Sequence, residues 1–153
     1  MDELARWLGQ QLDEDERIAQ ATAWCWSAQI DNSWTARPPR DEEEGWTVWS
    51  KGSALMASGL EEADAQHIAA HDPARVLREI DADRALVAAY EQACRKRTEI
   101  ADEHWGAAGP SGGLSAVERW KEHDAVAEAL KPHVLRRAAV YADRPGYRDD
   151  WRP

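Results

Sequence analysis

The chain of 153 residues carries 29 acidic side chains against 19 lysines and arginines, so its formal net charge is −10. This charge opposes direct binding to nucleic acid or to an anionic membrane, and no stretch offers the roughly 20 apolar residues that would span a bilayer. The two cysteines form no CxxC pair, and the acidic N-terminus lacks the apolar core of a signal peptide. We therefore expect a cytoplasmic protein, long enough to fold as a single domain over residues 1–153 without disulfides.

Residues 1–23 have the apolar periodicity of a half-buried helix. The side chains that share one face of this helix are Leu4, Trp7, Leu8, Leu12, Ile18 and Ala19. Gln11 and Asp15 lie in the same stripe, and we expect them at its solvated end or paired with an arginine, because an unpaired buried charge is costly.

Residues 24–58 lose the helical period and are rich in tryptophan, threonine, serine and glycine. Trp24 and Trp26 would share one face of a strand, and Trp46 and Val48 one face of another. A charged, proline-containing connection over residues 37–45 suits an exposed loop. This segment predicts a small antiparallel hairpin or a three-stranded sheet, which must pack on a helix to be stable.

Nine tryptophans and no phenylalanine set the segment apart chemically. The favoured interpretation is that the indoles form the core between sheet and helices. The alternative is an aromatic surface for a partner, since indoles offer a large contact area with a polar handle. The residues concerned are Trp24, Trp26, Trp46 and Trp49.

The next segment predicts a short helix over residues 61–70 and a long one over 73–104. Asp72-Pro73 separates them as a helix start, because aspartate caps free N–H groups and proline suits the first helical position. The long helix carries an apolar stripe interrupted by Asp83 and Arg97. Such a stripe could pair with a second copy or with another helix of the same chain. We predict homo-oligomerisation through Val76, Ile80, Val87 and Tyr90.

His67 and His71 are four residues apart and could face one metal ion on a continuous helix. The glutamate of a HExxH zinc site is missing, and Asp72-Pro73 predicts that the helix ends near His71. We therefore predict no metal and no cofactor. No GxSxG-like motif or other catalytic pattern is present, so a protein that is not an enzyme is favoured.

Residues 106–113 form a glycine-rich break, followed by predicted C-terminal helices over 114–142 and a turn-rich tail over 143–153. Ser115 with Glu118 fits a capping box. Pro132 predicts that residues 132–141 form a separate or kinked helix, because proline cannot donate the helical hydrogen bond. The whole chain is predicted to be an α+β protein, mainly helical, with an N-terminal helix, the small sheet and a long central helix.

The segments HIAAHDPARVLREIDADRAL and VYADRPGYRDDWRP resemble a family of small uncharacterised proteins of Streptomyces, related actinobacteria and their phages. The HDPARVL and YADxPxYxxxW elements carry the resemblance, and LDEDERIAQAT fits the same pattern. The resemblance implies a biological context but no reaction. It also implies a cysteine-rich metal knuckle before the YAD element, where this chain has Lys131 and His133 and no cysteine. The layout is also similar to that of small phage accessory proteins with a long, oligomerising helix.

The leading hypothesis is a non-enzymatic accessory protein that forms homo-oligomers and binds a host or phage protein. A second hypothesis is an acidic inhibitor or nucleic-acid mimic, which binds a basic host protein through the loop Asp41–Glu44. A third is a metal-dependent enzyme that uses His67 and His71.

Overall fold

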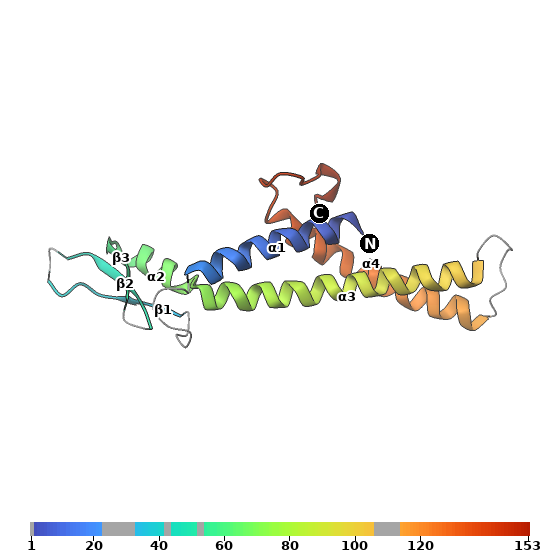
Figure 1. Cartoon of the computed structure of the whole chain (residues 1–153), viewed down its shortest axis with the longest axis horizontal. Helices are drawn as coiled ribbons and strands as arrows, with labels where there is room; N and C mark the ends of the chain where they lie inside the picture. The colour runs from blue at the N-terminus through green and yellow to red at the C-terminus, as the bar shows by residue number, and fades with distance from the viewer. Residues whose placement is uncertain (1, 23–32, 42–43, 52–53, 106–113) are drawn as a thin grey trace. The chain divides into compact units, whose positions relative to one another are not determined.

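The computed structural model describes residues 2–22, 33–41, 44–51, 54–105 and 114–153. The described part is α+β and mainly helical, as the sequence predicts (Figure 1). Its elements in chain order are α1 (Glu3–Thr22), β1 (Trp34–Arg37), β2 (Trp46–Ser50), β3 (Leu55–Leu60), α2 (Glu62–Ala70), α3 (Pro73–Trp105), α4 (Leu114–Ala139) and the 3-10 turn η1 (Asp149–Trp151). Among these helices, none combines the length and apolar character that crossing a bilayer requires.

The chain packs as two compact units. The helical unit consists of Met1–Asp13 and Ala82–Pro153, and the sheet unit consists of Glu14–Asp81. Helices α1 and α3 each have one end in the helical unit and the other end in the sheet unit.

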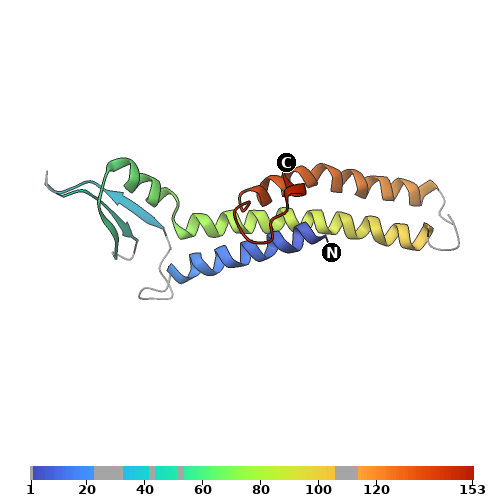
Figure 2. The ribbon, with the colours of Figure 1, turned by 90° about the horizontal axis from the view of Figure 1, so that it is seen from above.

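In the sheet unit, β1, β2 and β3 form an antiparallel three-stranded sheet in the order β1-β2-β3. Val48 lies opposite Ala36 and Ala57 and has no exposed surface. Helix α2 packs against all three strands, and its Ala65 is equally buried (Figure 2). One face of the sheet is therefore closed by α2, as a sheet this small requires for stability.

Helix α3 begins at the predicted place. The Asp72 carboxylate accepts a hydrogen bond from the backbone N–H of Arg75 at 2.6 Å, and Pro73 occupies the first helical position. The second carboxylate oxygen of Asp72 accepts the backbone N–H of Trp34 at 3.2 Å. One side chain thus caps α3 and holds the start of β1.

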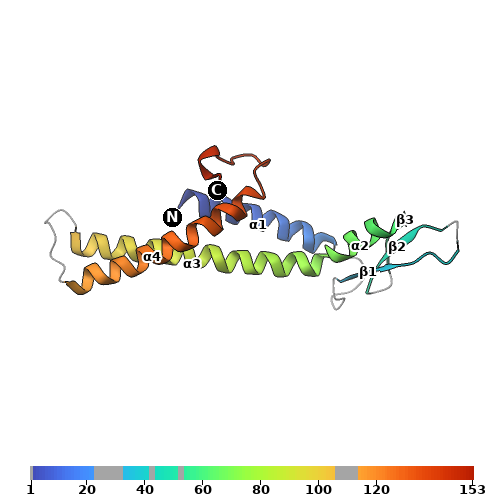
Figure 3. The ribbon, with the colours of Figure 1, turned by 180° about the vertical axis from the view of Figure 1, so that it is seen from behind.

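In the helical unit, α3 and α4 run antiparallel and side by side (Figure 3). Arg97 of α3 pairs with Asp124 of α4 at 2.8 Å, and Asp83 pairs with Arg137. The two polar residues that interrupt the apolar stripe of α3 therefore both form ion pairs with α4. Because each pair joins fixed positions of both helices, they specify the alignment of the hairpin.

Helix α4 corrects one of the two alternatives predicted for Pro132, the separate helix, and the kink stays a prediction. The helix continues from Leu114 to Ala139 with Pro132 inside it, and residues 132–141 do not form a separate helix. Pro132 lies on the exposed side of α4, as do Lys131 and His133. Water can therefore bond the carbonyl that proline leaves without an N–H partner, which lowers the usual penalty.

The C-terminal tail folds back onto α1 within the helical unit. The Trp7 indole N–H donates to the carbonyl of Pro145 at 3.0 Å, and Trp151 packs 5.3 Å from the Trp7 ring centre. Tyr141 and Tyr147 contact the same indole edge-on. Trp151 of the turn-rich tail is therefore docked and buried.

Candidate interaction surfaces

The outer face of the sheet, opposite Val48, carries a different set of side chains. Cross-strand pairing places Thr35 beside Trp49, Arg37 beside Thr47, and Trp49 beside Leu55. Trp49 is half-buried, and Leu55 keeps 51% of its surface exposed. A half-covered indole next to an exposed leucine is the composition of a contact surface.

Arg37 lies over Trp49, with its guanidinium carbon 4.9 Å from the ring centre. A hydrogen bond also holds the indole, since its N–H donates to the Thr47 hydroxyl at 3.0 Å. Within the described residues, neither Arg37 nor Arg40 forms an ion pair with a carboxylate. The cation–π contact holds the Arg37 guanidinium in place and leaves its N–H groups available to a bidentate acceptor.

A hollow of about 550 Å³ adjoins this stacked pair. Gly45 and Gly59 both line the hollow, and Gly45 permits their close backbone approach, because a Cβ at this position would lie 2.7 Å from the backbone of Gly59. Glu44 also lines the hollow, and its carboxylate accepts the backbone N–H of Arg40 at 3.2 Å. The other lining side chains include Arg37, Arg40, Thr47, Trp49 and Leu55.

The acidic loop is less uniformly negative than the sequence suggests. Asp41 accepts the backbone N–H of Glu44 at 3.0 Å, which closes a turn. Arg40 precedes this turn, and Arg37 lies at the same end of the sheet. The described ends of the loop therefore combine both charges.

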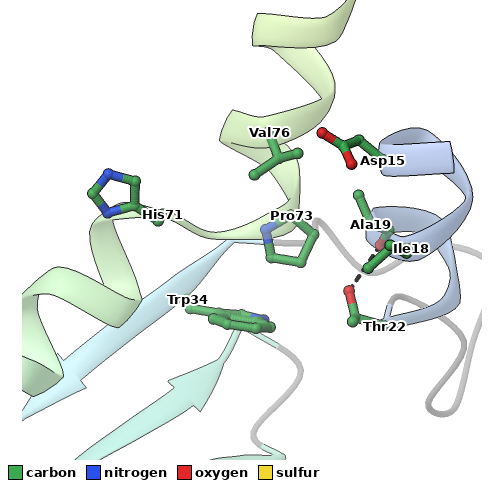
Figure 4. A pocket seen from close by; sticks show the side chains of 8 residues that line it. All are labelled: Asp15, Ile18, Ala19, Thr22, Trp34, His71, Pro73 and Val76. Atoms are coloured by element: carbon green, nitrogen blue, oxygen red, sulfur yellow. Dashed lines mark hydrogen bonds between the residues drawn. The ribbon is translucent and has the colours of Figure 1, made fainter. Parts of the chain in front are cut away.

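A second concavity in the sheet unit is a pocket of about 210 Å³, lined by α1, β1 and the start of α3 (Figure 4). The Trp34 indole forms its floor, and Pro73, Val76 and Ala19 form its walls. Ile18 borders the pocket and is 48% exposed, although it belongs to the predicted buried stripe of α1. The carboxylate of Asp15 and the imidazole of His71 lie at the rim.

The predicted tryptophans separate into different environments. Trp46 shares the inner face with Val48, and Trp49 lies on the outer face. Both are half-buried. Trp24 and Trp26 lie outside the described residues.

His67 and His71 come together, with ring centres 4.3 Å apart. His71 follows the last residue of α2, and its Nδ1 donates to the His67 carbonyl at 2.9 Å. Both residues are exposed, and no group of three or more metal-ligating side chains forms in the described part of the chain. A zinc site needs three or four protein ligands, so this pair is not by itself a metal centre.

Comparison with known protein families identifies the family of this chain. A model of a family of unknown function (DUF6221) matches residues 1–153. The chain belongs to this family. No curated protein and no solved structure matches it.

In this DUF6221 chain, most of the α3 residues predicted to mediate homo-oligomerisation are buried within the chain itself. Ile80, Val87 and Tyr90 are 3%, 8% and 4% exposed, and Val76 is half-buried where it lines the Trp34 pocket. The intramolecular alternative thus describes the packing of these residues. Homo-oligomerisation itself stays a prediction.

Tyr90 has a polar tether in addition to its packing. Its hydroxyl donates to the Asp2 carboxylate at 2.6 Å, while the other oxygen of Asp2 accepts the backbone N–H of Leu4. Burial, followed by the hydrogen bond to Asp2, raises the pKa of Tyr90 far above its ordinary value. The hydroxyl therefore stays protonated, and it ties α3 to the first turn of α1.

Sequence reasoning missed Arg37 and Leu55 as surface residues of this DUF6221 chain. Alternation along β1 and β2 does place Thr35 and Arg37 on one face and Trp34 on the other. The missing information was the pairing of β1 with β2, which decides that Arg37 lies beside Thr47 and close to Trp49.

Proposed function

We propose that the protein is a non-enzymatic accessory protein that binds an acidic peptide segment of a partner protein on the outer face of its sheet. The observation that carries the proposal is the Arg37 guanidinium stacked on Trp49 beside a hollow of about 550 Å³. Trp49 and Leu55 supply apolar contact area, and Arg37 supplies a fixed, bidentate donor. Aromatic and arginine side chains are the ones that most often dominate binding energy at protein interfaces.

Charge complementarity selects a carboxylate-bearing peptide. Arg37 and Arg40 both line the hollow, and arginine matches the geometry of a carboxylate. A polyanion such as nucleic acid suits the site less well, because the chain as a whole carries a net charge of −10. A single acidic residue within an otherwise apolar peptide meets the local positive charge without that long-range repulsion.

The test begins with selection of peptides from a random displayed library against the full chain. We expect the enriched peptides to carry aspartate or glutamate next to an apolar residue. Calorimetric titration should then show that Arg37→Ala and Trp49→Ala each weaken a selected peptide by about tenfold, which corresponds to about 1.4 kcal/mol. Arg17→Ala is the matched control, because Arg17 is exposed and pairs with Glu14 on α1. Failure to enrich any peptide, or binding that ignores Trp49→Ala, would overturn the proposal.

The acidic-mimic alternative gives the opposite result in the same assay. A chain that binds basic proteins through Asp41–Glu44 should enrich lysine- and arginine-rich peptides, and the Arg37→Ala variant should bind them more tightly. The mixed charge at the ends of this loop is the reason that we rank the acidic partner first.

Self-association is the second proposed activity. In the helical unit, the end of α3 and the start of α4 extend past the first residues of α1 (Figures 1–3). There α3 and α4 pack against each other without α1. Val126 on α4 is 47% exposed there. Light scattering after size-exclusion chromatography, over a concentration series, should show a dimer that Val126→Glu weakens and Ala129→Glu, a change at another exposed site of α4, does not. A monomer at every concentration would contradict this proposal.

We also propose the biological setting that the sequence resemblance implies, a cytoplasmic protein of actinobacteria or their phages. Membership of a family of unknown function supports a shared context without naming it. Neighbouring genes of phage type around several family members would support this setting, and their consistent absence would contradict it.

A further inference from the structure

The surface of α1 around Trp7 is a groove that the C-terminal tail of the same chain fills. We propose that this groove also accepts the tail of a second copy, so that two chains exchange residues 143–153 and form a dimer. The exchange involves the helical unit alone and is independent of the outer sheet face and of Val126. The following features of the tail carry this inference: its anchors, its polar rim, its connection to α4, an unsatisfied buried group and its charge.

The tail, dark red in Figure 1, is held on α1 by aromatic anchors, as a bound peptide is. Tyr147 and Trp151 lie four residues apart, and their ring centres are 5.6 and 5.3 Å from that of Trp7. The Trp7 indole N–H donates to the carbonyl of Pro145 at 3.0 Å. None of these contacts depends on the tail belonging to the same chain, so a tail from another copy can form all of them.

An ion pair lies at the edge of this aromatic contact. Arg148 pairs with Glu3 of α1 at 2.6 Å and with Asp150 of the tail at 2.8 Å, and all three side chains are largely exposed. Buried aromatic anchors inside a polar rim are the usual anatomy of a protein–protein interface. The contact between tail and α1 is therefore built like an interface.

The connection between α4 and the docked segment is short and exposed. Helix α4 ends at Ala139, Tyr141 packs on Trp7 with ring centres 6.5 Å apart, and Ala142 and Asp143 are exposed. A change of backbone angles at these two residues redirects the tail without unfolding α4. Exchange of a terminal segment between identical chains costs little, because the contacts of the single chain form again in the dimer, and short connections favour it.

One buried polar group stays unsatisfied when the tail is docked. The Tyr147 hydroxyl is shielded from water, and no hydrogen-bond partner for it exists among the described residues. A buried hydroxyl without a partner costs free energy, since the same group bonds to water when the tail is released. This cost reduces the free-energy difference between the docked and the released tail, and so it favours the opening that exchange requires.

The charge of the tail suits a second copy of this chain. Residues 143–153 contain three aspartates and three arginines, so their side chains carry no net charge. A strongly acidic segment would be repelled by a chain of net charge −10, whereas this tail is not. Because every copy carries both the groove and the tail, a two-fold dimer fills both grooves at once.

The first experiment tests whether the groove accepts a tail from another molecule. The ¹⁵N-labelled full chain with Tyr147→Ala and Trp151→Ala keeps the groove and lacks the anchors, and far-UV circular dichroism checks that it folds. Titration with a synthetic peptide of residues 143–153 should give a saturable shift of the Trp7 indole N–H signal, because the peptide supplies the Pro145 carbonyl again.

The same peptide with Gly146→Ala is the matched control. Gly146 has φ of 85°, and a Cβ there would lie 2.9 Å from Nε1 of Trp7. The control peptide should therefore bind at least about tenfold more weakly. Equal binding of the two peptides, or no binding by the folded variant, overturns the proposal.

The second experiment tests exchange between copies and changes exposed side chains only. Glu3→Arg in one chain and Arg148→Glu in another each place like charges across the groove within their own chain. After the two variants are mixed, an exchanged dimer restores opposite charges at both grooves. Light scattering should therefore show dimer at a roughly tenfold lower concentration in the mixture than in either variant alone, since two surface charge pairs contribute.

The control for the second experiment carries both Glu3→Arg and Arg148→Glu in one chain and should behave as the unmodified chain does. Val126→Glu, added to every variant, removes the other proposed contact between copies from the comparison. A dimer fraction that mixing does not raise overturns the exchange, even where the peptide binds. A rise that also occurs when the double variant is mixed with the unmodified chain overturns it as well, because the charges of the groove would then not be responsible.

Discussion

The helical unit and the sheet unit differ in how they cover their aromatic side chains. Trp7 and Trp151 of the helical unit are 8% and 7% exposed, and Tyr90 and Tyr141 are buried as well. In the sheet unit, Trp34, Trp46 and Trp49 are all half-buried. Helices and a folded-back tail surround the indoles of the helical unit, whereas among the described residues of the sheet unit a single short helix, α2, covers one face of three short strands. Half-covered tryptophans are therefore the expected places to find binding surfaces.

The largest expected effect comes from a comparison of two tryptophan-to-alanine substitutions, one in each unit. Trp7→Ala should lower the free energy of unfolding by about 3–5 kcal/mol, because it leaves a cavity among Tyr141, Tyr147 and Trp151. Trp49→Ala should cost roughly 1–2 kcal/mol, since its ring is only partly desolvated. Urea unfolding followed by circular dichroism measures both. Equal costs would show that Trp49 is a core residue and would remove the basis for the outer-face proposal.

Alanine substitutions of two glycines with positive φ, Gly146 and Gly59, compare how tightly the backbone is packed in the two units. Gly146 has φ of 85°, and a Cβ there would lie 2.9 Å from Nε1 of the buried Trp7. Gly146→Ala should therefore cost roughly 2–4 kcal/mol, from the left-handed backbone together with overpacking. Gly59 has φ of 69° but its Cβ would meet nothing within 4 Å, so Gly59→Ala should cost about 1–2 kcal/mol from the backbone alone. Thermal unfolding of both variants checks the order, and the reverse order would contradict the close docking of the tail.

Two helix caps provide a matched test of hydrogen-bond polarity. Asp2 and Asp72 each cap a long helix with one oxygen and accept a second hydrogen bond with the other. Asparagine at position 2 can donate its amide to the Tyr90 hydroxyl, whereas asparagine at position 72 would turn its amide toward the Trp34 N–H. Asp72→Asn should therefore destabilise by about 1–2 kcal/mol and Asp2→Asn by less than about 1 kcal/mol. Equal effects in denaturant titrations would show that the second hydrogen bonds contribute little.

Substitution of Tyr90 should have a small effect on stability near neutral pH and a specific one in alkali. Its pKa is raised in the folded state, so its contribution is complete below the unfolded value of about 10. Above that pH the unfolded chain ionises first, and stability should fall by up to about 1.4 kcal/mol per pH unit from this group. Tyr90→Phe should lose about 1 kcal/mol at pH 7 and show a correspondingly shallower alkaline decline. An unchanged alkaline slope in the variant would contradict the Asp2–Tyr90 tether.

The sequence determined the elements whose causes are local. Asp72-Pro73 specified the start of α3 because a cap and a fixed φ act within one turn. The apolar period of residues 1–23 and 73–104 specified α1 and α3 because one face of each helix must leave water. Pro132 shows the limit of this reasoning. The free-energy cost of a proline inside a helix depends on whether the carbonyl that loses its N–H donor can bond to water, and that depends on tertiary burial.

Only the tertiary structure decided what each side chain meets. Asp83 and Arg97 read as breaks in a stripe, and the pairing of α3 with α4 makes them ion-pair partners of Arg137 and Asp124. Alternation alone puts Trp46 and Trp49, three residues apart in β2, on opposite faces, but only the packing of α2 decides which of the two faces is covered. Burial and charge pairing depend on contacts between residues far apart in sequence, and local periodicity does not contain that information.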